Sequence, residues 1–205
     1  MSNTLCNART PQQVKLKSFE DYTFETDRLL IRPITEEDRD MYTGLYTDEK
    51  IMRNIKAPLT LERANEVFDK VLVAVKNSIK SRRPGYLIWT IEFKETRKKA
   101  GLQALIWQPK TLINNNTRQQ INTVNEPEVG IMLNRLAHGK HIPFEARKAL
   151  LYFAFTHLHV DKICTTFEAD NHPILRLIKR LGFSLADNYR LHTKNKSKDS
   201  DKVYR

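Results

Sequence analysis

The spacing of hydrophobic residues changes several times along the chain, and each change predicts a different kind of element. Alternation with period two, rich in β-branched and aromatic residues, predicts short strands, whereas spacings of three and four predict helices with one buried face. The strands expected on this basis are Arg28–Pro33, Tyr86–Phe93, Ala100–Trp107, Glu128–Leu133 and Lys162–Glu168, with two weak strands after Phe183.

Helices are expected between these strands. Their ranges are Thr35 to about Tyr46, with a further turn in Asp48–Ile55, then Thr60–Lys80, Phe144 to about His157, and Asn171–Arg180. In the longest of them the apolar residues fall on one face of the helix. These residues are Ala64, Val67, Phe68, Val71, Leu72 and Val75. The order of elements predicts one mixed α/β domain without internal repeats.

Two stretches lack a sustained hydrophobic period. Residues 1–23 are polar and are expected to form a flexible or irregular arm. Residues 108–126 contain Pro109 and a polar run, and a connection of this length in a compact domain is usually functional or disordered. We therefore expect a single domain over residues 24–205, with a loop insertion at 108–126 between two strands.

The composition excludes several classes of protein. Of the 205 residues, 40% are hydrophobic, and the longest apolar stretches, such as Ala149–Phe155, are far below the roughly 18 residues that span a bilayer. The N-terminus has no apolar central region typical of a secretory signal. Cys6 and Cys164 are far apart and show no metal-ligand spacing. We expect no membrane segment, no metal site, and a reducing, cytoplasmic location.

The net charge of +11 fits three kinds of partner: nucleic acid, an anionic membrane surface, or an acidic cofactor or substrate. Basic residues are densest at Lys76–Arg83, Lys94–Lys99 and Lys194–Lys202. None of these stretches interleaves aromatic with basic residues, as single-strand binding surfaces do. The pattern favours a solvated surface biased toward anionic partners over dedicated nucleic-acid binding.

Four segments, taken in order, resemble one known family. They are Glu25–Pro33 with the acidic residues after it, Glu128–Leu133, Glu145–Phe155 and Asn171–Phe183. Together they resemble the GNAT acetyltransferases, and most closely the branch that acetylates protein N-terminal amines, including those of ribosomal proteins. The resemblance covers about residues 24–205. It implies a GNAT-like α/β fold, with a mixed central sheet of six to seven strands and about four helices, and acetyl-CoA as co-substrate.

Within this resemblance Glu128 is the expected general base. The branch has a glutamate at this place on its central strand, which takes a proton from the attacking amine directly or through water. An amine is protonated at neutral pH and must lose a proton before it attacks a thioester, so a carboxylate suits this position. The alternative is a strand-edge glutamate that faces solvent.

The family's cofactor loop corresponds to His138, Gly139, Lys140, His141 and Ile142, which the resemblance assigns to the phosphates of coenzyme A. Backbone N–H groups and the positive helix end hold these phosphates in the family. His141 replaces the usual glycine, where a side chain blocks close approach or strains a turn with positive φ. Pro143 follows and removes one N–H donor. The alternative is a helix N-terminus that binds nothing.

Three further positions follow from the same comparison. Met132 and Leu133 are expected to offer main-chain groups to the pantetheine arm of the cofactor. Asn171 matches a residue that bonds this arm, although an asparagine here is also a good helix cap, and the two functions are compatible. Ile174 stands where the family often has a serine that protonates the departing thiolate.

Three hypotheses remain open at this point. The first is an active transferase, monomeric or homodimeric, that acetylates a primary amine, foremost a protein N-terminus and otherwise a small amine. The second is a catalytically impaired binding module that acts through its basic surface, and the third is a nucleic-acid-associated protein. Residues 108–126 and the helices Thr35–Ile55 and Thr60–Lys80 are expected to shape the acceptor site.

Overall fold

The computed structural model describes residues 18–53, 55–81, 84–107, 110–114, 117, 120–123, 126–168, 171–185, 189–191 and 201–204. Most of the arm expected over residues 1–23 lies outside them. Its described end contains the 3-10 turn η1 (Glu20–Tyr22), in which Tyr22 is buried. The indole N–H of Trp89 donates to the carbonyl oxygen of Tyr22 at 2.7 Å, so this end of the arm is attached to the core.

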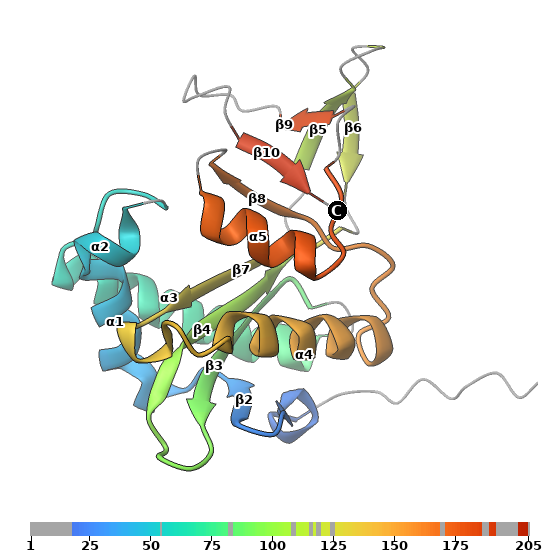
Figure 1. Cartoon of the computed structure of the whole chain (residues 1–205). Helices are drawn as coiled ribbons and strands as arrows, with labels where there is room; N and C mark the ends of the chain where they lie inside the picture. Colours follow the sequence, from blue (N-terminus) through green and yellow to red (C-terminus); the bar gives the residue numbers. More distant parts are fainter. Residues whose placement is uncertain are drawn as a thin grey trace, which may run out of the picture.

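The centre of the molecule is a five-stranded sheet in the order β1-β2-β3-β4-β7, with antiparallel neighbours throughout (Figure 1). Its strands are β1 (Phe24–Glu25), β2 (Leu29–Pro33), β3 (Tyr86–Phe93), β4 (Lys99–Ile106) and β7 (Glu128–Leu133). The sheet is smaller than the six to seven strands predicted. Its parallel pairing is limited to a single bridge between Glu128 and Cys164, because the next strand turns away from β7.

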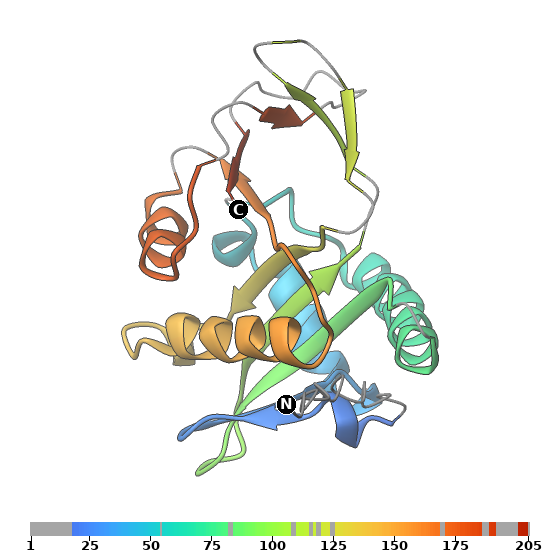
Figure 2. The same ribbon diagram turned by 90° about the vertical axis from the view of Figure 1, so that its right-hand side faces the viewer.

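The remaining described strands form two smaller sheets. Strand β8 (Thr165–Glu168) pairs with β10 (Asp201–Tyr204), and β5 (Lys110–Asn114) pairs with both β6 (Gln120–Thr123) and β9 (Tyr189–Leu191). The stretch expected as a loop insertion over residues 108–126 thus carries two antiparallel strands, β5 and β6. Figures 1 and 2 show this hairpin at the end of the molecule away from the first strands.

Helices form where the hydrophobic spacing predicts them. The described α-helices are α1 (Arg39–Thr47), α2 (Glu49–Met52), α3 (Leu61–Lys80), α4 (Ile142–Thr156) and α5 (His172–Arg180), with 3-10 turns η2 (Glu36–Asp38) and η3 (Arg135–Ala137). Helix α3 begins after Thr60, whose hydroxyl accepts from the N–H of Arg63 at 3.2 Å and satisfies one of the free amides of the first turn. None of the described helices is long and apolar enough to cross a membrane.

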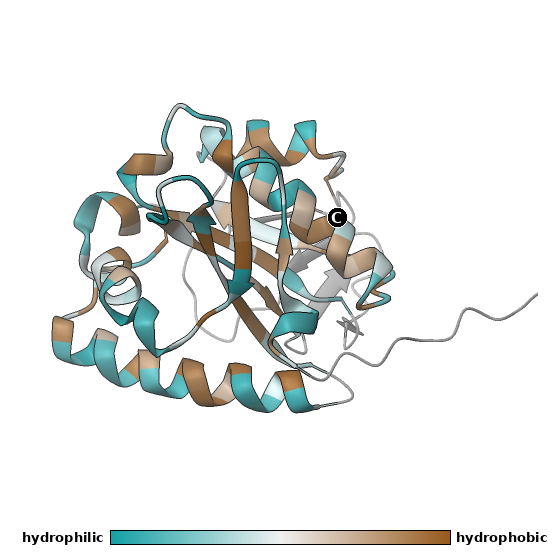
Figure 3. Cartoon of the chain, turned by 90° about the horizontal axis from the view of Figure 1, so that it is seen from below, coloured by the Kyte–Doolittle hydropathy of each residue, from teal (hydrophilic) through white to brown (hydrophobic). Residues whose placement is uncertain are grey.

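The helices cover the two faces of the sheet. Phe153 of α4 stacks on Phe24 with ring centroids 4.7 Å apart and meets Trp89 edge-on at 6.2 Å, so α4 covers one face. Helices α1 and α3 pack on the other face, where Tyr42 lies 5.0 Å from Phe68 between ring centroids. Figure 3 shows mainly hydrophobic central strands and a long helix α3 on which hydrophobic and hydrophilic residues alternate. Burial of these apolar faces positions every element that borders the candidate site.

A buried group of charges ties η2 to the sheet. Asp38 is fully buried, and its carboxylate accepts from the guanidinium of Arg32 at 2.8 and 3.0 Å and lies 2.8 Å from the ammonium of Lys99. The backbone N–H of Thr35 adds a bond of 2.9 Å. Burial alone raises the pKa of Asp38, but these donors outweigh it and lower the pKa to about 2. We call Asp38, Arg32 and Lys99 the η2 ion cluster.

Candidate active site

Strands β7 and β8 start side by side and then separate. At their one bridge the N–H of Val129 donates to the carbonyl oxygen of Cys164 at 2.9 Å, and the N–H of Cys164 donates to Pro127 at 3.0 Å. Beyond this bridge β8 pairs with β10, and the outer edge of β7 faces no described strand. Figures 1 and 2 show the two strands diverging, with α4 and α5 on the same side of the gap. We call this gap the β7–β8 cleft.

The backbone of β7 points polar groups into the cleft at alternate residues. Both main-chain groups of Val129 face away from β4, since its N–H bonds Cys164 and its carbonyl accepts from the hydroxyl of Thr165 at 3.1 Å. The register between β4 and β7 is continuous over the strand. Because main-chain groups alternate in an antiparallel ladder, those of Ile131 and Leu133 also face the cleft.

The same alternation turns the main-chain groups of Met132 away from the cleft, where the prediction had placed them. The main-chain groups of Gly130 and Met132 face β4, and a Cβ atom added at Gly101 of β4 would lie 2.2 Å from the carbonyl oxygen of Met132. Leu133 therefore faces the cleft as the prediction for a cofactor-binding strand requires, whereas the backbone of Met132 pairs with its neighbour. Ile131, which the sequence comparison did not single out, takes its place.

Side-chain directions in β7 follow from contacts across the sheet. Trp89 lies on the face covered by α4, because it meets Phe153. Trp89 is opposite Gln103 in β4, and Gln103 is opposite Ile131 in β7, so these three share that face. Glu128 lies three residues from Ile131 and points to the other face, where α1 and α3 pack.

Glu128 lies where the two strands part. Its carboxylate oxygen Oε1 accepts from the backbone N–H of Thr166 at 3.2 Å and from the hydroxyl of the same residue. The side chain is half-buried, so it is not the fully solvated edge glutamate of the alternative. A carboxylate oriented in this way, and still reachable, can accept a proton from a group at the base of the cleft.

The turn before α4 contains two residues with positive φ. His141 has φ 59° and ψ 14°, and Gly139 has φ 71°, so both residues adopt the left-handed conformation. This conformation costs a non-glycine residue about 1 kcal/mol or more, which confirms the expected strain at His141. The strain lies in the backbone, at a position where glycine would have none.

The N–H groups of this turn are free. No acceptor in the described part of the chain takes the backbone N–H of Gly139, Lys140, His141, Ile142 or Phe144. The first amides of a helix have no partner within the helix, and Pro143 removes one of them. The helix dipole adds a partial positive charge, so the turn suits an anion such as a phosphate.

The connection between β1 and β2 holds this turn in place. The guanidinium of Arg28 donates through Nη2 to the carbonyl oxygen of Lys140 at 3.0 Å and through Nε to the carboxylate of Glu145 at 2.8 Å. The hydroxyl of Thr26 donates to the other carboxylate oxygen of Glu145. Burial raises the pKa of Glu145, but the hydrogen bonds from Thr26 and Arg28 outweigh burial, so the pKa lies below its ordinary value. Sequence reasoning missed both residues, because it took Arg28 only as the start of a strand.

Asn171 lies at the start of α5, where it acts as a helix cap. Its side-chain oxygen accepts from the N–H of Ile174 at 3.4 Å. One of the two functions expected for Asn171 is thereby observed, and its contact with a cofactor arm stays a prediction. Ile174 has no group that could protonate a thiolate.

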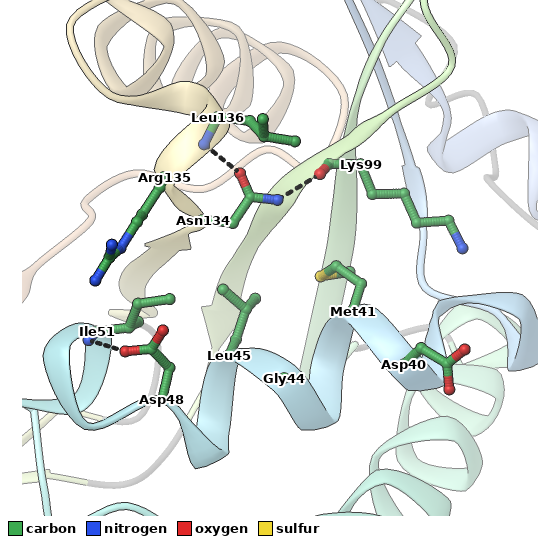
Figure 4. Close-up of a pocket in the computed structure, with 10 residues that line it drawn as sticks. All are labelled: Asp40, Met41, Gly44, Leu45, Asp48, Ile51, Lys99, Asn134, Arg135 and Leu136. Atoms are coloured by element: carbon green, nitrogen blue, oxygen red, sulfur yellow. Dashed lines mark hydrogen bonds between the residues drawn. The ribbon is translucent and has the colours of Figure 1, made fainter.

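A cavity of about 410 Å³ lies on the α1–α2 side of the sheet, beside the end of β7 (Figure 4). Asp40 and Asp48 line it together with Arg135. Asp48 accepts from the backbone N–H groups of Lys50 at 2.8 Å and Ile51 at 3.1 Å, and these bonds lower its pKa. The sequence predicted that the first helices shape an acceptor site, and residues of α1 and α2 line this cavity. No motif in the sequence singled out the individual residues.

No group of three or more His, Cys, Asp or Glu side chains in the described residues could hold a metal ion. The polar groups that the structure places along the cleft are the carboxylate of Glu128, the free amides before α4 and the open edge of β7.

Comparison with known proteins identifies the family. The acetyltransferase (GNAT) domain matches residues 28–184. An acetyltransferase from Agrobacterium tumefaciens str. C58 is similar in structure, with a TM-score of 0.66 and 21% identity over 89% of this chain and 92% of the other. The spermidine N-acetyltransferase of Vibrio cholerae, solved with CoA and spermine, has a TM-score of 0.63 and 17% identity over 87% and 95% of the two chains.

A third similar structure is a Vibrio cholerae protein described as a ribosomal-protein-serine acetyltransferase. Its TM-score is 0.62 and its identity 15%, over 90% of this chain and 96% of the other. No curated protein matches the sequence. These structural likenesses concern the fold, while the domain match covers most of the chain. The chain belongs to the GNAT acetyltransferase family.

Proposed function

We propose that this chain is an acetyl-CoA-dependent N-acetyltransferase that acts on a primary amine, foremost the N-terminus of a protein. The position of Glu128 carries the proposal. It lies where β7 and β8 part, its carboxylate is oriented by Thr166, and the free amides before α4 lie at the open end of the same cleft. Membership of the GNAT family supports acyl transfer as the reaction.

The residues of the cleft fit coenzyme A. Its phosphates match the free N–H groups of Gly139, Lys140, His141 and Ile142, and the basic side chains of His138 and Lys140 add positive charge. The main-chain groups of Leu133 and Ile131 would bond the pantetheine arm as a strand partner does. When bound, the cofactor supplies an acetyl group as a thioester.

Glu128 performs the proton transfer in this proposal. A primary amine is a cation at neutral pH, and its lone pair becomes available only after it loses a proton. The carboxylate of Glu128 accepts this proton, and Thr166 keeps the carboxylate aimed at the base of the cleft. The side chain of Glu128 points to the α1–α3 face, so the acceptor approaches from that face and the cofactor from the α4 side.

The choice of a polypeptide acceptor rests on the cavity beside α1 and α2. The cavity lies at the far end of β7 from Glu128, about 20 Å away along the strand. An acceptor that reaches both places must be long, and its polar groups would meet charges of both signs, Asp40 and Asp48 as well as Lys99 and Arg135. A peptide meets this condition, and so does a polyamine, which is the acceptor named for one similar structure.

The test is an acetylation assay with peptides of increasing length that carry a free N-terminus, the same peptides with a blocked N-terminus, and spermidine. We expect transfer to the free peptides and a loss of about 10²–10⁴-fold in kcat for Glu128→Gln. Glu95→Gln, in the exposed β3–β4 turn, is the charge-matched control and keeps full activity. If spermidine alone is acetylated, the polypeptide acceptor is wrong; an unchanged kcat in Glu128→Gln excludes Glu128 as the base.

A catalytically impaired binding module is the second candidate, favoured by His141, Pro143 and Ile174. Calorimetric titration of acetyl-CoA, in low and moderate salt, distinguishes the two. Saturable micromolar binding supports the transferase. No heat of binding at millimolar acetyl-CoA would leave a GNAT scaffold whose partner must be found through its basic surface.

A further inference from the structure

Arg147, the sixth residue of α4, is a buried cation that has no partner among the described residues. Only 4% of its surface is exposed, and the described residues provide neither an ion pair nor a hydrogen-bond acceptor for its guanidinium nitrogen Nε. Burial lowers the pKa of Arg147 to about 9, so the side chain is still charged at neutral pH. An arginine in such a place normally has an anionic partner, because desolvation of an unpaired charge is costly.

The side chain of Arg147 points to the flank of α4 that borders the β7–β8 cleft. Glu145 faces the opposite flank, where it bonds Thr26 and Arg28. Two residues along a helix correspond to a rotation of about 200°, so Arg147 faces away from β1 and toward β7 at the other edge of the sheet.

A contact between α4 and α5 fixes the same direction independently. Phe144 lies three residues before Arg147, hence on a neighbouring part of the helix surface, and its ring lies 4.0 Å from the guanidinium of Arg180 in α5. The flank that carries Phe144 and Arg147 is therefore the one that faces α5. Arg180, which lies on this side, is also positive and cannot balance Arg147.

The charges around this flank call for an anion. The Cα–Cβ bond of a helical residue is tilted toward the N-terminus of its helix, so we expect the guanidinium of Arg147 on the side of the first turn of α4. The free amides of Ile142 and Phe144 and the positive end of the helix dipole lie at that turn. The loop has lost one donor at Pro143, and a planar guanidinium suits phosphate oxygens in a bidentate arrangement.

We propose that Arg147 binds the diphosphate of coenzyme A from inside the cleft and replaces the binding energy that Pro143 and His141 remove from the loop. This inference rests on the proposed function. It concerns the diphosphate because this group adjoins the pantetheine arm, which has to lie along β7 for its thiol end to reach Glu128. The 3′-phosphate sits at the other end of the cofactor, beyond the adenosine.

Calorimetry with three ligands tests the assignment. Coenzyme A and dephospho-coenzyme A both contain the diphosphate, while pantetheine contains no phosphate. For Arg147→Met we expect the Kd of the first two ligands to rise about tenfold or more, and the Kd of pantetheine to stay unchanged. Arg147→Lys keeps the charge but not the planar guanidinium. Its Kd for coenzyme A should lie between those of Arg147→Met and the wild type.

Lys148→Met is the matched control, because Lys148 is the next residue of α4, carries the same charge and is exposed. We expect its affinity for all three ligands to stay within twofold of the wild type. A second readout uses the ligand-free protein: Arg147→Met removes an unpaired buried charge and should raise the Tm by about 2–4 °C.

The outcomes distinguish a failure of the inference about Arg147 from a failure of the proposed function. If the wild type binds coenzyme A and Arg147→Met binds it equally well, the inference is wrong and the proposed function stands. An equal loss for pantetheine, or a lower Tm of the ligand-free variant, would show that Arg147 supports the fold, and would also overturn the inference. If the wild type binds none of the three ligands, both the proposed function and the inference fail.

Discussion

Two regions of the molecule treat buried charge in opposite ways. In the η2 ion cluster, the carboxylate of Asp38 has donors from Arg32 and Lys99 and from a backbone N–H, all within the chain. Beside the β7–β8 cleft, Arg147 has no such partner among the described residues, and the backbone before α4 is strained at His141. In the first region the polar groups bond one another and stabilise the fold. In the second they are available to a ligand. This difference is one reason for placing the proposed cofactor site in the cleft.

The largest effect should come from breaking the satisfied region. Asp38→Asn places a neutral amide between two partly buried cations, Arg32 and Lys99, and leaves Arg32 only its longer ion pair with Glu92 at 3.4 Å. We expect a loss of about 3 kcal/mol in the free energy of unfolding, measured by urea denaturation at pH 7. A loss below about 0.5 kcal/mol would contradict the view that this cluster holds η2 on the sheet.

The same cluster predicts how stability depends on acid. The pKa of Asp38 is about 2 in the folded protein and 3.8 for an unperturbed carboxyl, so folding favours the ionised form. This contribution, about 2 kcal/mol, is fully present above pH 4 and disappears as the pH falls through about 2. We therefore expect the free energies of unfolding of the wild type and Asp38→Asn, measured by urea denaturation at pH 7, 4, 3 and 2, to converge as the pH falls. A stability difference that stays constant down to pH 2 contradicts the assignment.

A smaller effect is expected at the turn before α4, which Arg28 supports. Arg28→Gln removes the bonds to Lys140 and Glu145, and with them the support of the loop. Because Arg28 is half exposed, we expect a stability loss below about 1 kcal/mol but a Kd for acetyl-CoA three- to tenfold weaker. The control is Arg63→Gln, which breaks an exposed ion pair with Glu66 in α3 and should leave the Kd unchanged. Equal affinities of Arg28→Gln and the wild type would show that the turn is stable without this support.

The smallest effect should come from relieving the strain in the cleft. His141→Gly removes a side chain from a left-handed position, and we expect a gain of about 0.5–1 kcal/mol in stability with a Kd for acetyl-CoA a few-fold tighter. His159→Gly is the control, since His159 has φ 52° but lies after α4, away from the loop. It should gain similar stability without a change in Kd. Weaker binding by His141→Gly would mean that the imidazole itself contacts the cofactor.

The sequence predicted the elements whose hydrophobic pattern is strong. Helix α3 and strands β3 and β7 have the bounds expected, because each of them buries a regular set of side chains over its length. The hairpin β5–β6 was missed because Pro109 and the polar run in the middle of this stretch outweighed the β-branched residues on either side. The size of the central sheet was overestimated, since nothing local to Lys162–Glu168 indicates that β8 leaves β7 after one bridge.

The candidate site was predictable only in part. Glu128 and the turn with His141 were singled out through short motifs of the family resemblance, and their functional roles stay predictions. Met132 was misjudged because its main-chain direction depends on the register with β4, which no single-strand pattern contains. Arg28 and Arg147 were missed for a similar reason: their importance comes from partners that lie more than a hundred residues away, or from the lack of any partner.

The close approach at Gly101 limits how this sequence can change in evolution. Any side chain there would collide with the carbonyl of Met132 and force β7 outward from β4. The residues of β7 that border the cleft would move with it, so Gly101 limits the width of the cleft although it lies in β4, on the other side of β7. Among homologues that keep the activity, position 101 should tolerate no replacement, even where the residues that line the cleft have diverged.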